Sequence, residues 1–235
     1  MRSLAKRLAL LTYLGSLVIW CGPATAATVA MIGTGNVGAA LGERFADAGH
    51  RVVYGSRTPE AADVAALVQR TGQGASATSP AAAAALAEIV VLAVPWDAVG
   101  DVVESLGDLA GKIVVDPTNP RSTAPDGLRD YALETSNAER IQAWAPGSRV
   151  VKAFNTLGSE TMFDPPSAGG PVTIPVVGDD RAAKAAVVDL ARAIGLEGID
   201  VGPLRHARIV EGLHYLRFNA VGGPLNFHFR PEANR

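Results

Sequence analysis

Cysteine, surplus basic charge and metal-binding spacings are all scarce in this sequence. Its 235 residues include a single cysteine, which excludes an internal disulfide and a thiolate metal cluster. Lys and Arg together number 21 against 23 Asp and Glu, so no basic surface for nucleic acid is expected. The four histidines form neither an H-x-x-x-H nor an H-E-x-x-H pattern, and no Ser-His-Asp array stands out. We therefore expect no metal, no nucleic-acid partner and no residue assigned to acid-base catalysis.

The sequence also lacks any apolar run of the roughly 20 residues that a membrane-spanning helix needs. A shorter apolar run, residues 8–20, follows three basic residues and is followed by a Gly-Pro break and an A-T-A triplet that ends at Ala26. This order is typical of a secretory signal peptide. We expect residues 1–26 to be cleaved and the protein to be exported to the periplasm or outside the cell, with no stable membrane insertion afterwards. An uncleaved anchor is one alternative, and a wrongly placed start, which would leave the protein in the cytoplasm, is another.

After residue 26 the chain alternates between short apolar, β-branched runs and longer segments with helical spacing. The runs predict strands over residues 27–32, 51–54, 74–77, 88–94, 112–116, 149–153, 172–177 and 198–201. Helices are expected over residues 37–48, 59–70, 80–87, 96–106, 137–144, 181–194 and 204–218. This alternation indicates an α/β fold: a Rossmann-like, doubly wound, mostly parallel sheet with a C-terminal helix. We expect a single domain over residues 27–220 and a tail over residues 221–235.

A glycine-rich loop directly follows the first expected strand and opens the first helix. Its sequence is Gly33-Thr34-Gly35-Asn36-Val37-Gly38, which is the G-x-G-x-x-G pattern of dinucleotide-binding proteins. In that pattern the first glycine permits a tight turn, the second lets the backbone approach a pyrophosphate, and the third lets the helix pack on the strand. The helix N-terminus also offers unpaired N–H groups to an anion. These six residues are therefore predicted to bind a dinucleotide.

The end of the second expected strand indicates which dinucleotide binds. NAD sites place an acidic residue there for the ribose hydroxyls, whereas this chain has Gly55-Ser56-Arg57. A carboxylate would repel a 2′-phosphate, but a hydroxyl and a guanidinium can bind one. The sequence therefore predicts NADP(H) as the cofactor, with Ser56 and Arg57 at its 2′-phosphate.

Further candidate residues follow the ends of later strands, where ligands bind in open α/β sheets. Val94, Pro95 and Trp96 come after the fourth expected strand and are predicted to border the cofactor. After the fifth and sixth expected strands come the polar residues Thr118, Asn119, Asn155 and Thr156, of which the first three are assigned to cofactor binding. Lys152 lies inside a strand, where it would either offset an acidic ring or cap the sheet. The last helix carries His206 and His214, and either could contact a bound ring.

Several segments beyond the glycine loop resemble one known family. They are residues 30–60, 90–99 (VVLAVPWDAV), 112–120 (KIVVDPTNP), 150–158 (VVKAFNTLG) and 175–195. With these motifs the chain is similar to the F420-dependent NADP oxidoreductase family over essentially its whole length after residue 26. The resemblance implies hydride transfer between NADP(H) and coenzyme F420, an 8-hydroxy-5-deazaflavin.

The identity of the second ring stays open at this point. The reductase domain of six-transmembrane ferric reductases also resembles this fold and passes electrons to a flavin, so the acceptor is F420, a flavin or another small molecule. An exported NADP-binding or sensing module without turnover is the alternative to an enzyme. A homodimer is a further expectation, should the C-terminal helix expose an apolar face.

Overall fold

The computed structural model describes residues 26–120, 122–123, 125, 127–130, 134–230 and 232. Of the expected leader, only Ala26 falls within this set, so the signal-peptide prediction lies outside the described residues. In the part of the chain that is described, no helix combines the length and apolar character needed to cross a membrane.

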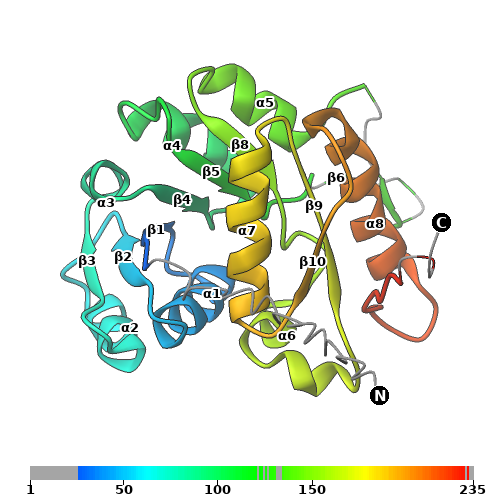
Figure 1. Cartoon of the computed structure of the whole chain (residues 1–235), viewed down its shortest axis with the longest axis horizontal. Coiled ribbons are helices and arrows are strands. Elements are labelled where there is room, and N and C mark those ends of the chain that lie inside the picture. The colour runs from blue at the N-terminus through cyan, green and yellow to red at the C-terminus, as the bar shows by residue number, and fades with distance from the viewer. Residues whose placement is uncertain are drawn as a thin grey trace, which may run out of the picture.

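An eight-stranded sheet forms the centre of the molecule (Figure 1). Its strands run in the order β10-β9-β8-β5-β4-β1-β2-β3. Their bounds are β1 Thr28–Ile32, β2 Arg51–Gly55, β3 Ser76–Thr78, β4 Ile89–Leu92, β5 Ile113–Asp116, β8 Arg149–Lys152, β9 Thr173–Gly178 and β10 Glu197–Asp200. Neighbouring strands pair in parallel, apart from β8 and β9, which are antiparallel. This confirms the predicted Rossmann-like, mostly parallel α/β fold.

Helices cover both faces of the sheet. They are α1 Asn36–Asp47, α2 Ala62–Thr71, α3 Pro80–Leu86, α4 Val99–Ser105, α5 Asn137–Trp144, α6 Ser159–Phe163, α7 Arg181–Ala193 and α8 Ala207–Asn219. One hydrophobic cluster joins α1, α2, α6 and α7 to the sheet, and a second joins α3, α4, α5 and α8. Strand β1 shows the division, because Val29 and Met31 belong to the first cluster and Ala30 and Ile32 to the second. Such burial on both faces explains the unbroken apolar runs in the sequence.

Three helices begin where the sequence supplies a cap. The side chains of Ser79 and Asp180 accept hydrogen bonds from the backbone N–H groups of Ala82 and Ala183, at the starts of α3 and α7. Helix α5 begins with a capping box in which Ser136 and Glu139 each accept a hydrogen bond from the other's backbone N–H. Because α5 starts at this box, the polar groups of its first turn have a fixed position beside the sheet.

The structure differs from the sequence-based expectation between β8 and β9. The connection contains the five-residue helix α6 and the 3-10 turn Pro165–Ala168, neither of which was predicted. Strand β9 then runs antiparallel to β8, so that Lys152 faces Val177. A short hairpin of β6 Ser122–Thr123 and β7 Arg129–Asp130 was missed as well. The expected helix over residues 96–106 is divided into a 3-10 turn, Trp96–Ala98, and α4.

Candidate functional site

A cleft of about 540 Å³ lies over the carboxyl ends of the central strands. The N-terminus of α1 borders it on one side, and the segments after β4, β5 and β8 form its floor. Predicted site residues that line it are Gly35, Asn36, Val37, Val94, Pro95, Trp96, Thr118, Asn119 and Asn155. The structure therefore brings together residues from four separate segments. The other predicted residues, Gly33, Thr34, Gly38, Ser56 and Arg57, do not line this cleft.

The three glycines of the loop differ in what a side chain would meet at each position. Gly33 has a φ of +111°, and a Cβ there would lie 2.4 Å from the carbonyl oxygen of Ala93. A Cβ on Gly38 would lie 2.1 Å from the carbonyl oxygen of Gly33, so a side chain at either position would collide with backbone. A Cβ on Gly35 would meet no atom of the described residues within 4 Å. Gly33 and Gly38 are thus required by the fold, whereas the space beside Gly35 belongs to the cleft.

Helix α1 opens directly at this space. Gly35 is its N-cap and supplies no side-chain cap, and Asn36 and Val37 in the first turn line the cleft. The first N–H groups of a helix have no intrahelical partner and carry a partial positive charge. This end of the cleft can therefore bind a phosphate group.

Ser56 and Arg57 follow β2 beside the glycine loop, as the N–H of Gly33 donates to the carbonyl of Gly55 over 3.0 Å. Ser56 is buried, and its Oγ accepts from the N–H of Thr58 at 3.2 Å, which fixes the turn. Arg57 is exposed. Arg57 therefore lies on the surface two residues after Gly55, which contacts the glycine loop, and its side chain is accessible to an anionic group.

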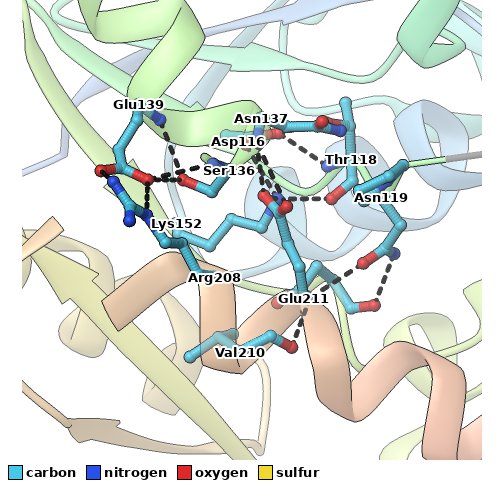
Figure 2. Close-up of polar contacts among 12 residues, drawn as sticks. Asp116, Thr118, Asn119, Ser136, Asn137, Glu139, Lys152, Arg208, Val210 and Glu211 are labelled. Atoms are coloured by element: carbon cyan, nitrogen blue, oxygen red, sulfur yellow. Dashed lines mark hydrogen bonds and ion pairs between the residues drawn. The ribbon is translucent and has the colours of Figure 1, made fainter. Parts of the chain in front are cut away.

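A network of buried polar groups lies under the segment that follows β5 (Figure 2). Asp116 Oδ1 accepts from both the N–H and the hydroxyl of Thr118, at 2.8 and 2.7 Å. The side-chain amide of Asn137, from α5, donates to the same hydroxyl at 3.0 Å. These contacts fix Thr118 in one orientation at the floor of the cleft.

Lys152 lies at the centre of this network and has no exposed side-chain surface. Its ammonium contacts Asp116 Oδ2 at 2.9 Å and Glu211 Oε1 at 2.8 Å. Burial alone would lower the pKa of Lys152, but the charges and hydrogen bonds of the two carboxylates outweigh burial and raise that pKa. The sequence left two roles open for Lys152, offsetting an acidic ring or capping the sheet. In the structure its ammonium is paired with two carboxylates of the chain, and the residue does not line the cleft.

The amides of Asn119 and Asn155 contact each other across the cleft floor. Asn155 Nδ2 donates to Asn119 Oδ1 at 3.0 Å, and Asn119 Nδ2 donates to the carbonyl of Asn155 at 2.8 Å. Asn155 is buried, and its Oδ1 has no hydrogen-bond partner among the described residues. Phe154 just before it has a φ of +64°, a backbone region rarely used by a bulky residue. A ligand amide in the cleft could satisfy the Asn155 oxygen.

A further wall of the cleft comes from α6, which packs beside α1, and from α8. Ser159 and Met162 of α6, and His214 and Phe218 of α8, line the cleft. The rings of His214 and Phe218 lie 4.5 Å apart and are tilted. Sequence reasoning missed both α6 residues, because a five-residue helix gives no periodic signal.

The two histidines of the last helical segment have different environments. The sequence allowed either histidine to contact a bound ring, and His214 is the one that lines the cleft. His206 instead contacts the carbonyl of Val201 through Nδ1, at 2.7 Å, and does not line the cleft. Only His214 can therefore contact a ligand bound there.

Trp96 forms a third side of the cleft. Its ring stacks on that of Trp144 with centroids 5.7 Å apart, and the guanidinium of Arg140 lies 5.9 Å from the Trp96 centroid. Trp144 and Arg140 thus hold the Trp96 ring in place, as a side chain that forms a wall of the cleft requires. No group of three or more His, Cys, Asp or Glu residues that could hold a metal ion occurs in the described part of the chain.

These features fit the dinucleotide that the sequence predicts. The open space beside Gly35 and the first turn of α1 suit a pyrophosphate. Ser56 and Arg57 suit a 2′-phosphate, and the unpaired Asn155 oxygen is an acceptor that a nicotinamide carboxamide can satisfy. Donor and acceptor types therefore match the expected ligand from one end of the site to the other.

Glu139 and Arg208 hold α8 against α5. Arg208 donates to both carboxylate oxygens of Glu139, from Nε and from a terminal nitrogen, each at 2.7 Å. Hydrogen bonds from Arg208 hold the pKa of Glu139 below its ordinary value. This bidentate pair fixes the start of the helix that carries His214.

The Arg208→Met substitution should lower the free energy of unfolding in a pH-dependent way. Because the folded-state pKa of Glu139 is depressed, the stabilisation is present above the ordinary glutamate pKa and is lost as pH falls through the folded value. The difference in the free energy of unfolding between wild type and variant should thus be present at neutral pH and vanish in acid. Denaturant unfolding across pH measures it.

The matched control for Arg208→Met is Arg192→Met, which breaks an exposed pair with Asp189 within α7. We expect no measurable pH-dependent difference there, because exposed pairs contribute little. A difference for Arg208→Met that persisted unchanged into acid would contradict the assignment to Glu139.

Comparison with known proteins shows which family has sequences similar to this chain. A family model described as NADP oxidoreductase, coenzyme F420-dependent, matches residues 28–120. The F420-dependent NADP reductase of Methanothermobacter thermautotrophicus is 35% identical over 202 residues, covering 80% of this chain and 85% of that one. The metalloreductase STEAP3 of Rattus norvegicus is 33% identical over 193 residues, which are 81% of this chain but 37% of that protein. The chain thus spans little more than a third of the metalloreductase.

Solved structures agree with the sequence comparison. A candidate F420-dependent NADP reductase from Arthrobacter sp. FB24 superposes with a TM-score of 0.76 at 32% identity, covering 88% of this chain and all of that one. An imine reductase from Aspergillus terreus, in complex with NADPH4, reaches a TM-score of 0.57 at 21% identity and covers 60% of that chain. At that identity the second likeness shows the fold alone.

Proposed function

The chain belongs to the F420-dependent NADP reductase family and is an NADP-dependent oxidoreductase, and we propose that it transfers a hydride between NADP(H) and a deazaflavin or flavin ring. One observation carries the proposal. The cleft has a phosphate-binding end at α1 and also a wall of Met162, His214 and Phe218 from α6 and α8. Flat apolar and aromatic side chains of this kind suit a second ring rather than a charged substrate.

The residues of the cleft bind and orient rather than exchange protons. The first turn of α1 would hold the pyrophosphate, with Ser56 and Arg57 at the 2′-phosphate. Asn119 and Asn155 would hold the nicotinamide end, and α8 would hold the acceptor ring. When bound, NADPH supplies the hydride to that ring. Holding two reactants in a fixed geometry is the protein's main contribution to such a reaction.

The proposed acceptor is tested by following NADPH oxidation at 340 nm with F420, FAD and FMN in turn. We expect at least one ring to oxidise NADPH, and we expect His214→Ala to slow the reaction by roughly tenfold because it removes a ring contact. His206→Ala is the matched control, since that ring does not line the cleft, and its rate should stay near that of wild type. Binding of NADPH without oxidation by any of the three rings would overturn the proposed acceptor class.

Export and self-association are also proposals. The basic, apolar and small-residue order of residues 1–26 supports export. Helix α8 leaves Ile209 and Leu216 exposed at 68% and 61%, which supports a homodimer through this face. N-terminal sequencing of protein from cell fractions tests the first, and light scattering of the purified protein tests the second.

A further inference from the structure

The buried Lys152 links its cross-strand partner Asp116 to two groups outside the sheet. Its ammonium contacts Asp116 Oδ2 at 2.9 Å, the carbonyl of Thr118 at 2.5 Å and Glu211 Oε1 at 2.8 Å. An ammonium has three N–H donors, so these acceptors account for all of them. Each partner belongs to a different part of the chain from β8: Asp116 ends β5, Thr118 follows it, and Glu211 lies in α8 (Figure 2).

On one side Lys152 fixes the nucleotide-facing floor of the cleft. Thr118 donates to Asp116 through its N–H and its hydroxyl, and accepts from Lys152 through its carbonyl. Thr118 and its neighbour Asn119 both line the cleft. A movement of the ammonium would therefore move the segment that faces the nicotinamide end of the site.

On the other side Lys152 fixes α8. Glu211 accepts from Lys152 and also from the backbone N–H of Asn137, at 2.9 and 3.2 Å to its two oxygens. His214 follows Glu211 by three residues, so both lie on one side of the helix. His214 and Phe218 form a wall of the cleft. The contact between Lys152 and Glu211 thus helps to set the position of that wall relative to β8, together with the hydrogen bond from Asn155 Nδ2 to the carbonyl of Val210 at 3.1 Å.

Stability gives little reason for such a cluster. Removing charges from water costs free energy, and well-packed apolar side chains of similar volume are often as stabilising as a buried ion pair. The three charged groups are buried beneath the cleft, where they contact its Thr118–Asn119 floor segment and belong in part to α8, which forms one wall. Their placement indicates a role in geometry.

We propose that Lys152 is a positioning residue: it sets the separation and relative orientation of the Thr118–Asn119 floor and the α8 wall, between which the hydride passes. This inference rests on the proposed function, because it assumes a nicotinamide on one wall and an acceptor ring on the other. Reaction between two bound rings is sensitive to shifts of about 1 Å in their placement.

The test compares two ligands that differ at the nicotinamide end. NADPH reaches the Thr118–Asn119 floor, whereas 2′,5′-ADP has no nicotinamide and should bind only at the α1 end. In Lys152→Met we expect the affinity for NADPH to fall by about tenfold, while the affinity for 2′,5′-ADP changes by less than about twofold. The enhancement of nicotinamide fluorescence on binding should fall as well. Calorimetry and fluorescence titration measure these effects without any acceptor.

Two further variants keep the test decisive. Lys152→Met leaves Asp116 and Glu211 uncompensated, so the triple variant with Asp116→Asn and Glu211→Gln removes all three charges at nearly constant volume. It should show the same split between the two ligands. Lys184→Met is the matched control, because Lys184 pairs with Asp200 at 2.8 Å in α7 and β10, outside the cleft, and should bind both ligands as wild type does.

The failure of this inference differs from the failure of the proposed function. Equal losses for NADPH and 2′,5′-ADP, or no loss for either in a folded variant, would overturn the positioning role. A wild-type protein that does not bind NADPH would overturn the premise itself.

Discussion

Replacing Gly35 with valine should remove dinucleotide binding and leave the fold intact. A Cβ at this position meets no atom of the described residues within 4 Å, and the backbone, with φ of −73°, suits any residue. The side chain would therefore occupy the space where a pyrophosphate approaches the first turn of α1. We expect the affinity for NADPH to fall by roughly 100-fold or more, since the branched side chain of valine would displace the phosphates from the helix N–H groups.

Two other glycines provide the controls for Gly35→Val. Gly170 has open space around it and does not line the cleft, so Gly170→Val should change neither NADPH affinity nor thermal stability. Gly38→Ala places a Cβ 2.1 Å from the carbonyl oxygen of Gly33 and should lower the melting temperature instead. Calorimetric titration and thermal unfolding of the three variants separate these effects. Unchanged NADPH affinity in Gly35→Val would contradict the assignment of the loop.

The parts of the fold that the sequence predicted well are those whose signal is local. Strands β1, β4 and β5 are buried on both faces, so they are apolar throughout except for Thr28 at the start of β1 and Asp116 at the end of β5. The glycine loop was predicted from a local pattern as well: Gly38 packs on the backbone of Gly33, five residues earlier, and Gly33 has a positive φ, although its close contact is with the distant Ala93. Local requirements of this kind leave a pattern in the sequence itself.

The direction of β9 could not be predicted, because an apolar strand looks alike in either direction. Its direction depends on the connection from β8, in which α6 has only five residues and packs beside α1. A helix of that length shows no periodicity. Consequently nothing in the sequence indicated that Ser159 and Met162 line the cleft, although they form part of the wall proposed for the second ring.

The buried charges show a different limit of prediction from the sequence, which concerns partners far apart along the chain. Lys152 stands out in the sequence as a charge within an apolar strand, but its partners Asp116 and Glu211 lie 36 and 59 residues away along the chain. Asp116 ends a strand and Glu211 lies on a helix with several other polar residues, so neither is marked as a partner. Only the tertiary structure identifies this cluster of three charged side chains and its place beneath the cleft.

Replacing Arg57 with alanine should change cofactor preference by a large factor. Arg57 is exposed at the end of β2, next to the turn that Ser56 fixes through its contact with the N–H of Thr58. A guanidinium there can donate two hydrogen bonds to a 2′-phosphate, and exposure to solvent weakens such charged contacts relative to buried ones. We expect Arg57→Ala to weaken NADPH binding by roughly 10- to 100-fold and NADH binding by less than about twofold.

The control for Arg57→Ala lies at the other end of the same strand. Arg51 is also exposed but begins β2, away from the carboxyl edge, so Arg51→Ala should leave both affinities unchanged. Raising the ionic strength gives an independent check, because screening weakens a phosphate–guanidinium contact on the surface. Wild type should lose NADPH affinity with salt more steeply than Arg57→Ala does. Equal losses of NADPH and NADH on removal of Arg57 would instead mean that the 2′-phosphate binds elsewhere, and the preference for NADP would then need a different residue.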